Sequence, residues 1–249
     1  MRRRERDSQL GRLEPTQMKI LVIDVGGSNI KMGMSARDER LKVPSGPELT
    51  AAKMVAAVRN ATEAWEYDVI SIGYPGPVVQ GKPAEEPKNL ASGWVGFEFE
   101  QSFRKPVRIA NDAAMQALGG YRGGRMLFLG LGTGLGSALV VEGLLQPLEL
   151  AHLPYRNDRT YEDYLGLRGY KRLGKKRWER HVEKVVAQLK HGLQADYVIL
   201  GGGQTKHLSA LPLGVHLGNN ADAIVGGFRL WSQPEWTRDK HWREEPDQT

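Results

Sequence analysis

The sequence predicts an α/β protein built from two related lobes that face a shared cleft. Two stretches carry this prediction, because residues 20–34 and 127–141 each read as a buried strand, a glycine-rich turn with a hydroxyl residue, and a second strand. Their spacing of more than a hundred residues excludes a solenoid and indicates two lobes of similar architecture. Each lobe would then present one glycine hairpin to the cleft.

Composition limits the class of protein. The 249 residues are 40% hydrophobic and 26% charged, which is typical of globular proteins with one large or two small domains. The absence of cysteine excludes disulfides and thiolate metal sites. No apolar run approaches the roughly 18 residues that span a bilayer, and no secretory signal is recognisable, so we expect a cytoplasmic protein without a membrane partner. The net charge of +6 indicates a polyanionic partner without identifying it.

The chain divides into two lobes and two tails. The arginine-rich residues 1–17 are expected to be a disordered basic tail, with Met18 as a candidate alternative start. A nucleic-acid-binding arm is the alternative reading of this tail, although we expect no specific nucleic acid partner. The N-terminal lobe is expected at 18–111, closed by a helix at 221–231; the C-terminal lobe is expected at 112–220, followed by a charged tail at 232–249.

Both glycine turns have the features of anion sites made from backbone. Successive backbone N–H groups form a concavity that holds phosphate, and Gly130, Gly132, Gly134 and Gly136 can take φ values that side chains forbid. In the first hairpin, Asp24 closes the strand before the glycines, where a carboxylate could hold Mg²⁺ through water. A plain glycine hairpin is the alternative in each case.

The elements between the hairpins lead to a second acidic position. We expect a strand at 39–43, a helix at 48–65, a strand at 68–73, a rigid turn at 74–77, an irregular loop at 83–96 and a strand at 107–110. The last strand delivers Asn111 and Asp112 to the start of a helix. These residues could simply cap that helix. In phosphoryl transfer, however, the acceptor hydroxyl needs a carboxylate to orient it and take its proton, and Asn111 suits a polyhydroxyl ligand.

Three features follow the second hairpin. Glu149 and His152 lie close enough in sequence to point at one small polar molecule, although surface solvation explains them equally well. Residues 166–192 are largely helical in pattern, with an expected apolar stripe formed by Trp178, Val182, Val185, Val186 and Leu189. Seven cations against the single acid Glu179 lie between 168 and 180, which suggests a polyanion track or a solvated helix face. A buried strand at 196–200 runs into Gly201, Gly202, Gly203 and an expected helix start, which would direct backbone N–H groups and a helix dipole at an anion or nucleotide.

These motifs, taken in order, resemble the ROK family of sugar kinases, and within it the polyphosphate glucokinase branch. The resemblance rests on Asp-Val-Gly-Gly-Ser-Asn-Ile-Lys at 24–31, Tyr-Pro-Gly at 74–76, Asn-Asp at 111–112, Gly-Leu-Gly-Thr-Gly-Leu-Gly at 130–136, Glu-Leu-Ala-His at 149–152 and Gly-Gly-Gly at 201–203. It covers about residues 19–231. It implies the two-lobed fold of hexokinase, actin and Hsp70, with ribonuclease-H-like lobes and the active site between them.

The resemblance also assigns roles. It implies that Asp112 is the general base and that Mg²⁺ and the phosphates are held by Asp24, Gly26, Gly27, Ser28, Asn29, Lys31, Gly132, Thr133 and Gly134. Gly201, Gly202 and Gly203 would bind the nucleotide or its replacement. Sugar hydroxyls would be bound by Pro75, Gly76, Asn111, Asp112, Glu149, His152 and Glu162. The implied reaction moves a phosphoryl group from polyphosphate or ATP to the 6-hydroxyl of glucose.

Departures from the family pattern leave alternatives open. The zinc-binding cysteine motif of many ROK proteins is missing, so we expect Mg²⁺ and no zinc. Ala151 stands where the family has glycine, so another hexose and an ATP-dependent kinase remain alternatives, and a homodimer remains open. A sugar-sensing ROK regulator would need a DNA-binding domain, for which we expect no room in residues 1–17. An actin-like or chaperone ATPase would need additional subdomains.

Overall fold

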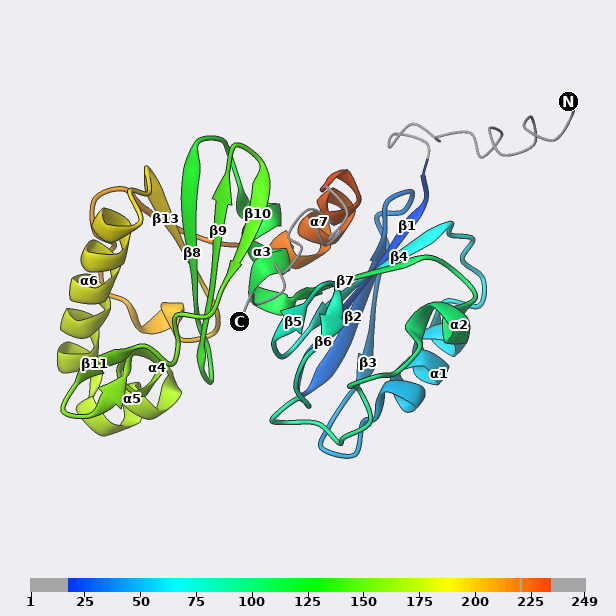
Figure 1. The fold of residues 1–249 in the computed structure, drawn as a ribbon, viewed down its shortest axis with the longest axis horizontal. Coiled ribbons are helices and arrows are strands. Elements are labelled where there is room, and N and C mark those ends of the chain that lie inside the picture. The colour runs from blue at the N-terminus through cyan, green and yellow to red at the C-terminus, as the bar shows by residue number, and fades with distance from the viewer. Residues whose placement is uncertain (1–17, 220, 234–249) are drawn as a thin grey trace, which may run out of the picture.

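The computed structural model describes residues 18–219 and 221–233, and Figure 1 shows two α/β halves with helices α3 (Asp112–Gly120) and α7 (Asp222–Arg229) between them. The expected tail at 1–17 lies outside the described residues, as does the expected tail at 232–249 after Gln233. The predicted α/β fold class is confirmed.

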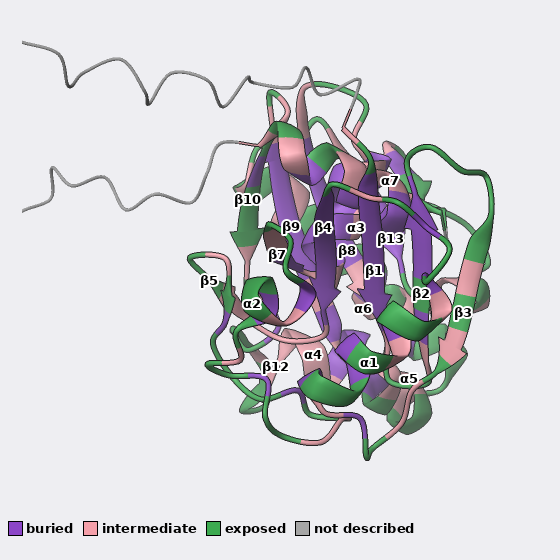
Figure 2. Cartoon of the chain, turned by 90° about the vertical axis from the view of Figure 1, so that its right-hand side faces the viewer, coloured by how far each residue is buried: buried purple, intermediate pink, exposed green. Residues whose placement is uncertain are grey.

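The N-terminal sheet has the strand order β3-β2-β1-β4-β7. Its first three strands form an antiparallel meander, and β4 and β7 run parallel to β1. The strands are β1 (Ile20–Val25), β2 (Asn29–Met34), β3 (Arg40–Pro44), β4 (Val69–Tyr74) and β7 (Val107–Asn111). Every residue of β1 and β4 is buried, as expected for strands covered on both faces (Figure 2).

The C-terminal sheet repeats this plan with the order β10-β9-β8-β13-β14. Again three strands form an antiparallel meander, and the fourth and fifth run parallel to the first. The strands are β8 (Arg125–Leu131), β9 (Leu135–Val141), β10 (Leu144–Leu148), β13 (Tyr197–Gly201) and β14 (Val215–Leu217). The shared order and directions explain the weak internal repeat, because each glycine hairpin is the first hairpin of its sheet.

Helices cover the outer faces of both sheets. In the N-terminal half these are α1 (Ala51–Ala61) and α2 (Phe99–Phe103). Helix α1 is shorter than the expected 48–65, because the Thr50 side chain accepts from the Lys53 N–H and so caps its start. The short hairpins β5 (Val78–Val79) with β6 (Lys82–Pro83) and β11 (Pro154–Arg156) with β12 (Arg159–Thr160) lie outside the main sheets.

The expected helical region 166–192 is two helices, because Gly174 has a φ of 69° and ends the first. Helices α4 (Tyr161–Leu165) and α5 (Leu167–Leu173) lead into α6 (Lys175–Gly192). The expected apolar stripe of α6 is confirmed, since Trp178, Val182, Val185 and Val186 are buried in the C-terminal core. None of the described helices is both long enough and apolar enough to cross a membrane.

Helices α3 and α7 join the two halves through their backbones. A β-carbon on Gly226 would overlap the Met115 carbonyl oxygen, so only glycine allows this approach. Helix α7 also packs on the N-terminal sheet, where Ser71 Oγ donates to the Gly227 carbonyl at 2.6 Å, and η2 (Leu230–Ser232) follows it. The helix expected at 221–231 therefore packs on the N-terminal sheet as well as on α3.

Candidate active site

Strand ends of the N-terminal sheet bring Asp24, the 74–77 turn and Asn111 to one edge. Strands β1, β4 and β7 are parallel, and their register pairs Asp24 with Gly73 and Tyr74 with Asn111. Adjacent strands lie about 4.8 Å apart, so Asp24 and Asn111 are separated by about two strand spacings. Ligands commonly bind at this edge of an α/β sheet.

The first glycine turn, residues 26–28, is held by short local bonds. The Gly26 N–H donates to the Asn29 carbonyl at 3.0 Å, and Ser45 Oγ donates to the Gly26 carbonyl at 2.6 Å. Gly27 and Ser28 are exposed, and the next strand places Lys31 Nζ 3.4 Å from the Asp24 carboxylate. The turn thus presents backbone and one cation beside a buried carboxylate.

Asn111 caps helix α3. Its Oδ1 accepts from the Ala113 and Ala114 N–H groups at 3.0 and 3.4 Å, and its Nδ2 donates to the Gly76 carbonyl at 3.0 Å. The capping alternative is therefore confirmed for Asn111. The side chain nevertheless stays half-exposed and joins two predicted sugar-binding segments.

Asp112, the first residue of α3, is a carboxyl with an altered pKa. Desolvation, followed by the negative charge of Asp24, raises the pKa of Asp112 to about 6. Its Oδ1 accepts from the Ala113 N–H at 2.7 Å, which opposes that rise. Burial likewise raises the pKa of Asp24, with Lys31 acting against it. A carboxyl that titrates near 6 is suited to accept a proton at neutral pH.

The strand that follows the second glycine turn, residues 132–134, lies beside the first turn of α3. A β-carbon on Gly136 would sit 2.5 Å from the Ala113 β-carbon, so strand β9 and α3 touch closely there. None of Gly130, Gly132, Gly134 and Gly136 has a positive φ, so the hairpin does not use the left-handed backbone that these glycines allow. At Gly136 the missing side chain instead permits the close approach of β9 to Ala113, the residue after Asp112.

The loop with Gly201, Gly202 and Gly203 packs directly on the same hairpin. The Gln204 N–H donates to the Leu131 carbonyl at 2.9 Å, and a β-carbon on Gly202, whose φ is +85°, would overlap the Leu131 backbone. The expected helix start is wrong, because only the short 3-10 turn η1 (Thr205–His207) follows. A helix dipole therefore cannot contribute to anion binding at this loop.

Of the two predicted sugar ligands at 149–152, Glu149 lines a cavity that residues of both halves share. Glu149 and His152 are exposed, and Glu149 lines a cavity of about 240 Å³ together with Asn111, Ser137 and the 77–81 hairpin. Ala151 is buried in the apolar cluster of the C-terminal half. The methyl group that replaces the family's glycine is thus part of a core.

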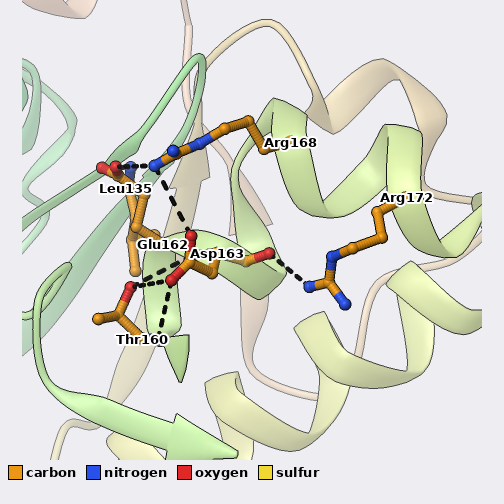
Figure 3. Close-up of polar contacts among 6 residues, drawn as sticks. All are labelled: Leu135, Thr160, Glu162, Asp163, Arg168 and Arg172. Atoms are coloured by element: carbon orange, nitrogen blue, oxygen red, sulfur yellow. Dashed lines mark hydrogen bonds and ion pairs between the residues drawn. The ribbon is translucent and has the colours of Figure 1, made fainter. Parts of the chain in front are cut away.

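Glu162 contacts the second glycine turn. Its carboxylate accepts from the Leu135 N–H at 3.3 Å and pairs with Arg168 at 3.2 Å (Figure 3). The Glu162 N–H donates to the Ala151 carbonyl at 3.0 Å, which ties this residue to the predicted sugar loop. Its predicted role as a sugar ligand stays a prediction.

The basic segment is less uniform than its sequence indicates. Arg168 is paired with Glu162 and Asp163, and Arg172 donates to the Asp163 carbonyl at 2.8 Å (Figure 3). The Arg172 guanidinium also lies over the Tyr164 ring. The remaining cations of the segment are exposed on α5 and α6: Lys171, Lys175, Lys176, Arg177 and Arg180. Five of the seven cations therefore make no hydrogen bond or salt bridge within the described residues.

Sequence reasoning overlooked an aromatic pair beside the donor loop. His207, four residues after Gly203, stacks on Tyr170 with ring centroids 4.3 Å apart and an interplanar angle of 18°. Tyr170 in turn meets the Trp178 ring edge-to-face. No local pattern connects positions 170 and 207, because the contact depends on how α5 packs against η1.

The carboxylates suit a magnesium ion bound mainly through phosphate and water. Within residues 18–219 and 221–233, no group of three or more His, Asp or Glu residues lies close enough to form a metal cage. The negative charge of Asp24 acts on the Asp112 carboxyl, and Mg²⁺ in phosphoryl-transfer sites is typically held by one or two carboxylates plus substrate oxygens. The expected lack of zinc stays a prediction.

Comparisons with known proteins agree with this geometry. The chain is 29% identical over 205 residues to the polyphosphate glucokinase of Mycobacterium leprae, covering 73% of this chain and 62% of that protein. It is 29% identical over 226 residues to the polyphosphate glucokinase of Mycobacterium tuberculosis, covering 76% and 78% of the two chains. The chain thus spans less than two thirds of the M. leprae protein. No family model matches the chain.

Solved structures share the fold. The inorganic polyphosphate/ATP-glucomannokinase of Arthrobacter sp. superposes with a TM-score of 0.72 at 22% identity, covering 85% of this chain and 97% of that one. A ROK family glucokinase from Streptomyces griseus gives a TM-score of 0.64 at 18% identity, covering 85% and 98%. These findings confirm the resemblance predicted from the motifs: the chain has the two-lobed fold of the ROK sugar kinases and is similar in sequence to polyphosphate glucokinases.

Proposed function

We propose that this chain transfers a phosphoryl group from polyphosphate or ATP to the 6-hydroxyl of glucose. The observation that carries the proposal is Asp112, a carboxyl with a pKa of about 6 that starts α3, next to the close contact of Ala113 with Gly136 in the strand that follows the second glycine turn. Such a carboxylate can orient an acceptor hydroxyl while the turn holds the phosphate that reacts with it. Polyphosphate glucokinases are among the relatives that match in sequence.

In this proposal the chain's residues position the reactants and manage one proton. Asn111, Glu149 and His152 bind sugar hydroxyls, and the 6-hydroxyl donates a hydrogen bond to Asp112. As the sugar oxygen bonds to the terminal phosphorus and the bridging P–O bond of the donor breaks, Asp112 takes the hydroxyl proton. Backbone N–H groups of both glycine turns stabilise charge on the phosphoryl oxygens. Bound Mg²⁺, held by Asp24, would neutralise part of the donor's charge.

The test of this function uses purified protein with several hexoses and both donors. We expect Mg²⁺-dependent formation of a sugar phosphate, with glucose among the accepted sugars. Sugar binding without turnover on either donor would contradict the kinase and favour a sugar-sensing role. Turnover with another hexose alone would correct the acceptor only.

We further propose that polyphosphate is used at least as well as ATP. The five exposed cations on α5 and α6 follow Leu167, whose N–H donates to the Gly132 and Thr133 carbonyls at 3.1 and 3.3 Å. Helix α5 therefore begins at the second glycine turn, and a long anion bound there could continue along the cations of α5 and α6. Binding through such a row weakens steeply with salt because counterions are released.

The donor experiment removes cations that make no hydrogen bond or salt bridge within the described residues. We would replace Lys171, Lys175 and Lys176 with alanine, and compare a variant with the same loss of charge on other elements, lacking Lys53, Lys82 and Lys105. The first variant should raise KM for polyphosphate and flatten its salt dependence, with little effect on KM for ATP. Equal loss with both donors, or with both variants, would contradict the track.

ATP use has its own supporting observation. The stacked Tyr170 and His207 rings lie beside the Gly201 to Gly203 loop, where an aromatic surface could receive the adenine base. If His207→Ala raises KM for ATP and spares polyphosphate, the nucleotide binds at this pair. A cytoplasmic location and a homodimer belong to the same proposal as expectations from sequence.

A further inference from the structure

Residues 162–168 hold the second glycine turn through hydrogen bonds to three backbone groups in the turn or next to it. The Leu135 N–H donates to Glu162, and the Leu167 N–H donates to the carbonyls of Gly132 and Thr133. A β-carbon on Gly134 would overlap the Glu162 carboxylate, so this carboxylate lies directly against the turn. The shape of the turn therefore depends on Glu162.

This support places a negative charge where the proposed donor phosphate binds. The Glu162 side chain is only 15% exposed, so water screens its charge incompletely. An unpaired carboxylate in contact with an anion site would repel the donor. The position therefore needs a compensating cation.

Arg168 supplies that cation. Its Nη2 lies 3.2 Å from Glu162 Oε1 and 3.7 Å from Asp163 Oδ1, as Figure 3 shows. The arginine side chain is 72% exposed, and ion pairs with such exposure contribute little to folding stability. Its effect is therefore expected in the potential at the turn, with little effect on the fold.

We propose that Glu162 and Arg168 are a positioning pair in which Glu162 shapes the second glycine turn and Arg168 cancels the charge that this support introduces. The inference rests on the proposed function, because it takes the turn to hold donor phosphate. It gives Glu162 a role toward the donor in addition to, or in place of, the sugar contact that the family resemblance implies. Loss of the arginine alone should be more harmful than loss of both charges.

Four proteins test the pair: the wild type, Arg168→Ala, Glu162→Gln and the double variant. Glutamine keeps an oxygen that accepts from the Leu135 N–H but removes the charge. We expect Arg168→Ala to raise KM about tenfold for both polyphosphate and ATP, because both present a terminal phosphate to the turn. The double variant should return both values to within about threefold of the wild type. Arg168→Lys should recover part of the affinity.

Controls separate this inference from a structural effect and from the proposed function. Arg122→Ala, which removes an exposed arginine at the far end of α3, should leave both KM values unchanged. Binding of inorganic tripolyphosphate, measured by calorimetry with each protein, gives a readout apart from turnover and should follow the same order. The melting temperature should change little in Arg168→Ala.

Three outcomes would overturn the inference while leaving the kinase intact. KM for polyphosphate could rise without any change for ATP, which would make Arg168 a member of the cation row alone. The double variant could fail to recover donor binding. Glu162→Gln could raise KM for the sugar while Arg168→Ala leaves donor binding unchanged. Absence of sugar phosphorylation by the wild type would instead refute the proposed function itself.

Discussion

Gly136→Ala tests whether the close approach of β9 and α3 builds the active site. The new β-carbon would lie 2.5 Å from that of Ala113, whereas carbon atoms in contact sit about 3.5–4.0 Å apart. The helix and strand must therefore separate by about 1 to 1.5 Å, which moves Asp112 away from the second glycine turn. Because a misplacement of about 1 Å can cost on the order of 100-fold in rate, we expect kcat/KM to fall by about that factor.

The matched rescue moves the same methyl group across the contact. In the exchange variant Gly136→Ala with Ala113→Gly, the nearest atom to the new β-carbon is the residue 113 α-carbon at 3.9 Å, an ordinary contact. We expect most of the rate to return, at a helix cost of about 1 kcal/mol. Gly192→Ala is the control, because no atom lies within 4 Å of the added carbon.

A coupled assay of sugar phosphorylation and thermal unfolding would be run on all four proteins. Two results would show that the contact at Gly136 does not set the position of Asp112. In the first, Gly136→Ala keeps the wild-type kcat/KM with an unchanged melting temperature. In the second, the exchange variant stays as slow as the single variant while folding normally.

Four further predictions concern the same site and the two helices behind it. Asp112→Asn should lower kcat by about 10² to 10⁴ while calorimetry still detects sugar binding; a variant that kept a tenth of the activity would not have lost its base. Since Asp112 must be ionised to accept the proton and its pKa is about 6, kcat/KM in the wild type should fall as pH drops through 6, and an acid limb near pH 4 would contradict this. Dialysis against a zinc-selective chelator should leave the rate unchanged once Mg²⁺ is restored, whereas stoichiometric zinc in the protein would refute the expectation. Gly226→Ala should lower the free energy of unfolding by about 1–3 kcal/mol or more in denaturant titrations, because its β-carbon overlaps the Met115 carbonyl; an unchanged midpoint would show that α3 and α7 can move apart freely.

The sequence alone determined the elements whose signals are local. Continuous apolar runs predicted β1, β4, β8 and β13, because strands covered on both faces need apolar residues throughout. The α6 stripe was likewise readable from its helical period. Glycine-flanked strand pairs predicted both hairpins, and their resemblance predicted the two-lobed plan.

Only the tertiary structure decided how these elements meet. The glycines of the second hairpin read as flexible backbone, yet at Gly136 the missing side chain serves contact with Ala113 in a helix that begins 24 residues earlier. Arg168 and Arg172 differ from the other cations of the basic segment because they bind groups on α4. Tyr170 stacks on His207, and Glu162 accepts from the Leu135 N–H. No helical or strand periodicity relates the two positions of either contact. Close packing between distant segments has no local signature, because it is set by the shapes that both surfaces present only after folding.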